Sequence, residues 1–470
     1  MLTIDYTNCL ADRVGGHGLE AASLAPGSDS DRLAGELTER LEDVRQTGPT
    51  RWRGLPMDPM RGAHLQAIEP LVERLRGRFD NMIVLGIGGS ALGNIALQSA
   101  LNPPTWNLQG DDERSGPRLF VLDNVDPAHV AQTIRFIENN GGFERTLVNV
   151  VSKSGETAET AAQFMILRDA LIRAVGKDKH GEHIVAITDP AKGTMRAICD
   201  EAGYATLPVP DGVGGRFSVL SPVGLFSAAM CGIDVRAMLD GAAAMDVRCS
   251  ELGLDENPAA MLATIFVRLG LEKGKTNHVM MPYANSLHLM ADWFRQIWAE
   301  SLGKRVNDAG EEVFAGFTPI KALGATDQHS QIQLYREGPN DKAIALLAVE
   351  SFDEDVAIPA GLGAEALSYL EGSTLGALLD AERRATAYAL AESQRPNLTI
   401  SFPQIDARHI GEFIQMWQMA TAFAGLMLRI DAYDQPAVEL GKQATFGLMG
   451  RRGYEEWAGR VGAVTGTHTV

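Results

Sequence analysis

A short run of donor side chains at residues 152–157 is the densest chemical signal in the sequence. It reads Ser-Lys-Ser-Gly-Glu-Thr, follows an apolar run and precedes a helical pattern. Hydroxyl groups, an ammonium group and the free N–H groups of a helix N-terminus together suit a phosphate group. The run therefore predicts a phosphate-binding loop, although Ser and Thr also favour helix N-caps that bind nothing. Because Glu156 would repel a phosphate, we expect its carboxylate to face away.

A glycine-rich turn at residues 86–93 is a second candidate for anion binding. It reads Gly-Ile-Gly-Gly-Ser-Ala-Leu-Gly and follows an apolar run. The spacing of Gly86, Gly88 and Ala91 fits the loose dinucleotide fingerprint, but a tight strand-to-helix turn without a ligand gives the same pattern. That fingerprint calls for an acidic residue about 20 residues further on, whereas Asp123 comes 30 residues after Gly93. A nicotinamide-dependent oxidoreductase therefore stays an alternative.

A predicted helix over residues 286–303 carries one polar face. The face is formed at every fourth position by His288, Asp292, Gln296 and Glu300. Such faces are more often solvated than functional. Here, however, Glu300 follows Trp298 closely, and an aromatic surface that excludes water would raise the basicity of the carboxylate. The helix end therefore predicts a general base.

Three further segments hold residues that could bind or move protons. The turn at residues 324–330 carries His329, which could titrate near neutral pH or simply act as a turn donor. Gln435 and Lys442 lie about two helical turns apart in a segment whose default interpretation is a surface helix. Residues 212–225 are too rich in glycine for a regular element and too apolar for a solvated linker, so we expect them to line a site.

Composition limits the classes of function. The chain has 470 residues, of which 45% are hydrophobic, and a net charge of −18. This acidity disfavours nucleic acid and anionic membranes as partners, so any anion must bind in a small preorganised pocket. The four cysteines form no C-x-x-C pair, and no close spacing of His and carboxylates suggests a metal site. We find neither a signal peptide nor an apolar run that could span a membrane, and we expect a cytoplasmic protein.

The elements that position these residues follow an α/β pattern. Short apolar runs alternate with helical stretches, as expected for parallel strands covered by helices. The strands are predicted at 82–89, 119–127, 146–156 and 183–190, and then at 277–284, 342–351 and 398–404; the long helices are predicted at 31–46, 286–303, 364–392 and 407–428. The sequence thus predicts two doubly wound parallel-sheet domains.

Taken together, these segments resemble the glucose-6-phosphate isomerase (phosphoglucose isomerase) family, whose two core domains are sugar isomerase (SIS) domains. The resemblance covers most of residues 80–445 and rests on six motifs in the family's order. They are GIGGSALG, SKSGETAET, VGGRFSVLSPVGL, the helix ending in WAESLGK, GATDQHSQ and DQPAVELGKQ. Each motif alone is modest, whereas the six in order are specific.

The resemblance assigns roles to individual residues. It implies substrate and phosphate binding by Gly89, Ser90, Ser152, Lys153, Ser154, Thr157, Gly215, Gln296 and Gln435. It implies catalysis by Glu300 as the proton-transferring carboxylate, Arg216 as the group that stabilises the transition state, and His329 and Lys442 in ring opening. In this family the histidine comes from the neighbouring subunit, which implies a homodimer with composite sites.

The resemblance also implies an activity and a domain organisation. We expect reversible, cofactor-free and metal-free isomerisation of glucose 6-phosphate and fructose 6-phosphate through a cis-enediol(ate), as in glycolysis and gluconeogenesis. A non-catalytic SIS module that only binds sugar phosphates is a second alternative. The expected parts are a helical N-terminal extension (1–60), a first SIS domain with the phosphate-binding loop (61–245), a second SIS domain with Glu300 and His329 (246–430), and a C-terminal helical segment carrying Lys442 (431–470).

Overall fold

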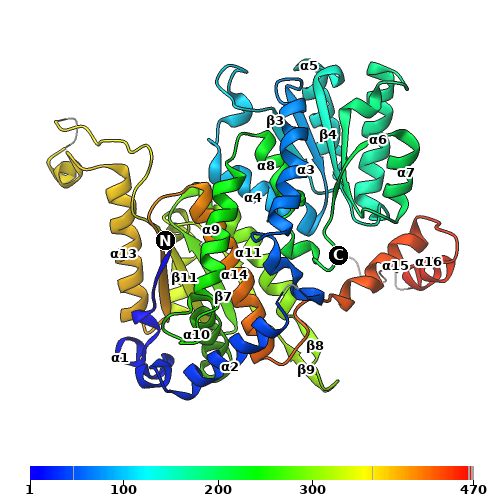
Figure 1. Cartoon of the computed structure of the whole chain (residues 1–470). Helices are drawn as coiled ribbons and strands as arrows, with labels where there is room; N and C mark the ends of the chain where they lie inside the picture. The colour runs from blue at the N-terminus through cyan, green and yellow to red at the C-terminus, as the bar shows by residue number, and fades with distance from the viewer. Residues whose placement is uncertain (46, 362–363, 464–465, 467–470) are drawn as a thin grey trace.

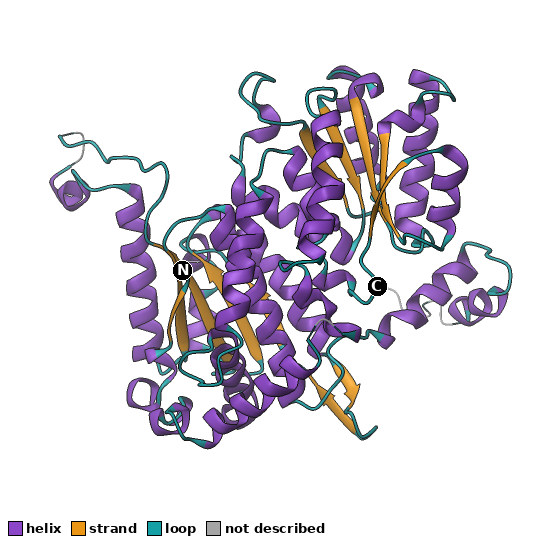
Figure 2. Cartoon of the chain, in the orientation of Figure 1, coloured by secondary structure: helices purple, strands orange, loops and turns teal. Residues whose placement is uncertain are grey.

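The computed structural model describes residues 1–45, 47–361, 364–463 and 466. Two five-stranded sheets, each covered by helices, lie in separate parts of the molecule (Figure 1, Figure 2). Helices occupy both faces of each sheet, which explains why most of the strands are nearly continuous apolar runs. The predicted α/β class with two parallel-sheet domains and helical extensions is confirmed.

The first sheet is wholly parallel, with the strand order β3-β2-β4-β5-β6. Its strands are β2 (Asn81–Leu85), β3 (Arg118–Leu122), β4 (Thr146–Val151), β5 (Ile184–Thr188) and β6 (Ala205–Pro208). The first four confirm the predicted strands. The edge strand β6 was not predicted, because its four residues carry too little apolar character to stand out.

The second sheet has the order β1-β12-β11-β7-β10, and its four pairings include one antiparallel pair, β1 with β12. Its strands are β1 (Thr3–Asp5), β7 (Asn277–Pro282), β10 (Thr318–Lys321), β11 (Lys342–Val349) and β12 (Asn397–Phe402). The three long strands were predicted, whereas the short edge strands β1 and β10 were not. A separate hairpin is formed by β8 (Lys304–Val306) and β9 (Glu312–Ala315).

The four parallel strands of the second sheet, β7, β10, β11 and β12, follow the same order as the first four strands of the first sheet. In the first sheet β2 lies between β3 and β4, and in the second sheet β7 lies between β10 and β11. The strand order therefore reverses at β2 and at β7. Ligands of doubly wound sheets bind outside the carboxyl ends of the strands at such a reversal. In the first sheet this point lies between β2 and β4, and the glycine-rich turn and the predicted phosphate-binding loop follow those two strands.

The long helices lie close to their predicted positions. They are α2 (Asp29–Asp43), α11 (His288–Leu302), α13 (Leu375–Glu392) and α14 (Ala407–Met427). The helix predicted at 364–392 is wrong at its start, because Gly372 has a φ of +76° and Thr374 caps a new helix by accepting a hydrogen bond from the Ala377 N–H. The predicted end of the first helix, Gln46, lies outside the described residues.

The remaining helices complete the layers. They are α1 (Ala11–Val14), α3 (Met60–Leu75), α4 (Leu92–Leu101), α5 (Pro127–Asn139), α6 (Ala158–Val175), α7 (Thr194–Ala202), α8 (Pro222–Met230), α9 (Val235–Arg248), α10 (Pro258–Lys273) and α12 (Ile332–Glu337). A hairpin of α15 (Glu439–Leu448) and α16 (Glu455–Gly462) projects from the body at the C-terminal end (Figure 1). Residues 464–465 and 467–470 of the predicted C-terminal segment lie outside the described residues.

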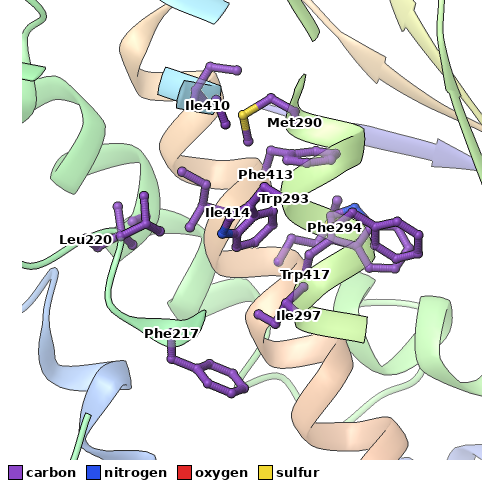
Figure 3. Packing of buried hydrophobic residues seen from close by; sticks show 14 of the residues in the cluster. Phe217, Leu220, Met290, Trp293, Phe294, Ile297, Ile410, Phe413, Ile414 and Trp417 are labelled. Atoms are coloured by element: carbon purple, nitrogen blue, oxygen red, sulfur yellow. The ribbon is translucent and has the colours of Figure 1, made fainter. Parts of the chain in front are cut away.

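The largest hydrophobic core joins the two halves of the chain. Figure 3 shows side chains of α11 and α14, among them Trp293, Phe294 and Trp417, packed together, with Phe217 and Leu220 from the glycine-rich segment nearby. The segment at 212–225 is thus partly core, and its last residues already belong to α8. Among the described helices, none is long and apolar enough to cross a membrane.

Helices α9 and α14 approach each other closely because each has a glycine at the crossing. A Cβ atom on Gly411 would lie 1.9 Å from the carbonyl oxygen of Met238, and one on Gly241 would lie 1.9 Å from that of Arg408. Real side chains do not tolerate such distances to backbone atoms. The two glycines therefore set the distance between the two helices.

We predict that Gly411→Ala lowers the free energy of unfolding by about 1–3 kcal/mol, because the added methyl group must push two packed helices apart. The matched control is Gly459→Ala in α16, where a Cβ atom meets nothing within 4 Å. This control should leave stability unchanged or slightly raised, since alanine favours helix over glycine. Urea unfolding followed by circular dichroism measures both variants. Equal stability of the two variants would contradict the packing argument.

Candidate active site

The loop after β4 places its donors at the carboxyl end of the first sheet. Ser152 is buried, and its hydroxyl accepts a hydrogen bond from the Gly155 N–H at 3.1 Å. Gly155 has a φ of +78°, and a Cβ there would lie 2.3 Å from the Met195 nitrogen, so only glycine fits. This fixed turn leaves Ser154 exposed and Thr157 half-buried at the start of α6.

All five predicted phosphate-binding side chains line one cavity of about 650 Å³. They are Ser90, Ser152, Lys153, Ser154 and Thr157. Thr157 occupies the N-cap position of α6, but its hydroxyl makes no capping hydrogen bond. Its hydroxyl and the first N–H groups of the helix therefore stay available to an anion. Thr157 is therefore not an ordinary N-cap, whereas Ser152 and Ser154 each accept a hydrogen bond from a backbone N–H within the loop.

Glu156, the acidic residue of this loop, is bound on both carboxylate oxygens. Arg451 donates to one oxygen at 2.9 Å, and the hydroxyl of Thr194 donates to the other at 3.2 Å. These bonds, with Arg451 the stronger influence, hold the pKa of Glu156 below its usual value. Glu156 does not line the cavity formed by the five donors, although it lines the larger cavity beside it.

The glycine-rich turn after β2 contacts the backbone of the loop that carries Arg216. A Cβ atom on Gly89 would lie 2.2 Å from the carbonyl carbon of Gly215 and 2.6 Å from the nitrogen of Arg216. Gly89 is therefore required because the two loops touch. This contact brings Arg216 to the switch point of the first sheet, and it explains the glycine without a bound dinucleotide.

Arg216 is the most connected side chain of the site, and it is buried. Its Nε donates to the hydroxyl of Ser301 at 2.7 Å, and its Nη1 donates to Gln435 Oε1 at 2.9 Å. Its Nη2 donates to the carbonyl oxygens of Ala432 at 2.6 Å and Asp434 at 3.1 Å. Burial lowers the pKa of Arg216, and the nearby Glu300 carboxylate opposes this effect. An arginine stays charged at neutral pH despite such a shift.

Glu300 ends the polar face of α11 and lies beside Arg216. Its Oε1 is 3.9 Å from Arg216 Nη1, and its Oε2 accepts a hydrogen bond from Gln296 Nε2 at 3.1 Å. The side chain is 29% exposed, so it remains open to the cavity. Trp298 was expected to shield it, but this indole lies in the core and donates to His278 at 3.0 Å. The side chains beside the Glu300 carboxylate are instead those of Arg216 and Gln296.

A second cavity, of about 690 Å³, joins these groups to the phosphate-binding loop. Its lining includes predicted residues from five parts of the chain, namely Gly89, Ser154, Thr157, Gly215, Arg216, Gln296, Glu300, Gln435 and Lys442. Lys442 lies on α15, is half exposed and pairs with Glu439 at 2.7 Å. The catalytic carboxylate expected from the sequence thus shares one cavity with two of the expected phosphate donors, Ser154 and Thr157.

His329 is the predicted site residue that this chain does not bring to the cavity. It ends the short helical turn Thr326–His329, it is exposed, and it is not part of the lining of either cavity. Its neighbour Gln328 is fixed by a hydrogen bond of 2.7 Å to the hydroxyl of Tyr283. The turn therefore presents His329 outward.

Two residues of the site were not singled out in the sequence. Ser301, adjacent to Glu300, accepts the Arg216 hydrogen bond described above. Lys304 donates to the carbonyl oxygens of Glu300 at 2.8 Å and Ser301 at 2.9 Å, so it caps the end of α11. A lysine just after the last helical turn is a recognisable C-terminal signal. Within the described residues, no group of three or more His, Cys, Asp or Glu side chains is arranged to hold a metal ion.

Comparison with known proteins identifies the family of the chain. The family model described as "Phosphoglucose isomerase" matches residues 74–448. Glucose-6-phosphate isomerase from Carboxydothermus hydrogenoformans is 46% identical over 417 residues, covering 88% of each chain. Glucose-6-phosphate isomerase from Rubrobacter xylanophilus is 42% identical, covering 96% of this chain and 99% of its own.

A solved structure shows the same fold over almost the whole chain. A hypothetical protein from Thermus thermophilus superimposes with a TM-score of 0.84 and 36% identity, covering 96% of this chain and 100% of its own. The matched family model covers every strand of the two sheets except β1 and ends in α15, and so includes each predicted site residue. The chain belongs to the phosphoglucose isomerase family.

Proposed function

We propose that this protein interconverts glucose 6-phosphate and fructose 6-phosphate, as in glycolysis and gluconeogenesis. One observation carries the proposal: Glu300 and Arg216 line the same cavity as Ser154 and Thr157. A sugar phosphate held by its phosphate in this loop can therefore present its other end to the carboxylate. The names of the most similar relatives support this substrate pair.

The phosphate supplies binding energy away from the reacting carbons. Hydroxyl groups, the Lys153 ammonium group and the N-terminus of α6 would hold it, which orients the sugar. In the open-chain aldose, Glu300 removes the proton from C2, and the electron pair forms the C1–C2 double bond of a cis-enediol(ate). The same carboxyl group then returns a proton to C1, while the hydroxyl proton moves from O2 to O1, which leaves the carbonyl group at C2 and gives the ketose. One movable base accounts for the proton on carbon, and the proposal needs no metal or other cofactor.

Arg216 would stabilise the charge that develops on the enediolate oxygen. Four of its five N–H donors are engaged by described residues, so the guanidinium is rigid and preorganised. The remaining Nη1 hydrogen is on the side of Glu300, where Nη1 lies 3.9 Å from the carboxylate. Gln296 would orient Glu300 through its 3.1 Å hydrogen bond.

Ring opening needs a group that moves protons on and off the ring oxygen. We assign this role to His329 and Lys442, with Gln435 contacting the sugar, following the family pattern. Because His329 faces outward in this chain, we propose a homodimer in which each subunit supplies this histidine to its partner's cavity. We also propose that the enzyme is cytoplasmic. The two alternatives, an oxidoreductase that uses NAD and a non-catalytic sugar-phosphate module, are not favoured by the isomerase relatives.

We predict that Glu300→Gln lowers kcat by at least about 100-fold, because amide groups cannot act as the general base. The matched control is Glu159→Gln, which removes another carboxylate from the same cavity and should keep most of the activity. The assay starts from fructose 6-phosphate in heavy water and reads deuterium at C2 of the glucose 6-phosphate formed. Full activity of Glu300→Gln would contradict the mechanism, whereas deuterium at C2 would show that the transferred proton exchanges with the solvent.

We predict that Glu300→Gln and His329→Ala subunits restore activity when they are mixed. In a mixed dimer one site combines an intact Glu300 with an intact His329 of the partner subunit, so random pairing restores about a quarter of the wild-type activity. The two variants are unfolded together, refolded together and assayed, with each variant refolded alone as the control. No gain on mixing would show that His329 acts within its own chain or not at all.

A further inference from the structure

The helix that carries Lys442 is tied to the rest of the site at both ends. Before α15, Gln435 accepts the 2.9 Å hydrogen bond of Arg216. After α15, Arg451 makes the 2.9 Å ion pair with Glu156, the acidic residue of the phosphate-binding loop. Lys442 lies between these two ties and lines the cavity that they border. Figure 1 shows the hairpin of α15 and α16 extending from the body.

We propose that the Arg451–Glu156 ion pair positions Lys442 over the substrate cavity. This inference rests on the proposed function, because it assigns Arg451 and Glu156 to positioning the group that assists ring opening. Neither residue would touch the reacting atoms. The pair couples the placement of α15 to the loop that holds the phosphate, so the two walls of the cavity keep a fixed distance.

The Arg451 side of the pair is rigid. Its N–H donates to the Phe446 carbonyl oxygen at 2.8 Å, which closes the turn after α15. Its guanidinium stacks over the ring of Phe446 at 4.4 Å and over that of Tyr454 at 5.5 Å, and these two rings pack edge to face at 5.2 Å. The turn between α15 and α16 thus holds the guanidinium in one place. Since Phe446 also lines the cavity, the stacked group belongs to its wall.

The Glu156 side is equally constrained. Its second carboxylate oxygen accepts a hydrogen bond from the Thr194 hydroxyl. The preceding residue, Gly155, is packed so tightly that the loop keeps the turn described above. Both partners are therefore ordered before they meet, which reduces the entropy lost on pairing. Each side chain is still about half exposed, at 43% for Arg451 and 50% for Glu156. An exposed pair contributes about 0.2–1 kcal/mol, so its loss changes a rate by about 1.4- to 5-fold.

Arg451→Ala tests the inference, with Arg452→Ala as the matched control. Arg452 is the exposed neighbour and makes none of these contacts. We expect kcat for fructose 6-phosphate to fall by about 2- to 5-fold in Arg451→Ala, within the range of such pairs, and to stay unchanged in Arg452→Ala. Added NaCl should bring the wild type toward the variant, because salt screens an exposed pair.

Two further measurements identify the route of the effect. In a Lys442→Met background, Arg451→Ala should cause no further loss of kcat, since residues that act through one group are not additive. Hydrogen exchange of the α15 amides in the unliganded protein should speed up in Arg451→Ala and not in Arg452→Ala.

Several results would overturn the inference. These are equal kcat values for the two arginine variants, an equal loss with and without Lys442, or unchanged exchange of α15. An inactive wild type would instead contradict the proposed function. Because hydrogen exchange needs no substrate, it still tests the ion pair in that case.

Discussion

The buried guanidinium of Arg216 is the group on which the site depends. A buried cation is costly unless its donors are bonded, and here the partners come from the end of α11 and from the segment before α15. The loop that carries Arg216 lies against Gly89, so the glycine-rich turn of the first sheet is held in the same assembly. Displacing either of these two segments would leave N–H donors of a buried cation without acceptors. The position of Glu300, one residue before Ser301, follows from the same constraint.

The two sheets share the order of four parallel strands but contribute to the site in different ways. The first sheet provides the loops at its own switch point, between β2 and β4. The second sheet provides α11, which begins just after β7 and carries Glu300 near its other end. A helix of 15 residues spans about 22 Å, so the carboxylate lies far from the switch point of its own sheet. Packing of α11 against α4 and α14 directs it to the first sheet instead.

The sequence predicts the parts of the fold that depend on strong local patterns. Buried strands such as β4 and β11 are continuous apolar runs, and the helices have clear periodicity. The edge strands β1 and β10 were missed because three or four residues, one of them a proline in β10, show no such pattern.

The donors of the phosphate-binding loop were predictable because they are adjacent. Arg216 and Gln435 lie 219 residues apart, so only the family resemblance joined them, and Arg451 has no motif. The domain boundaries at 60, 245 and 430 stay predictions.

A chain with a net charge of −18 must bind a dianionic substrate without help from its overall field. Two of the acidic groups close to the donors are bound by neighbouring hydrogen-bond donors. Glu156 is bound by Arg451 and Thr194, and one carboxylate oxygen of Asp189 accepts the N–H groups of Ala191 and Lys192. Hydrogen bonds of this kind spread the negative charge onto dipoles and cations that are already in place. Salt in the surrounding solution largely screens charges that lie more than about 10 Å away. The phosphate would therefore respond mainly to the hydroxyls, the lysine and the helix end within its reach, and the acidity of the surface would matter little.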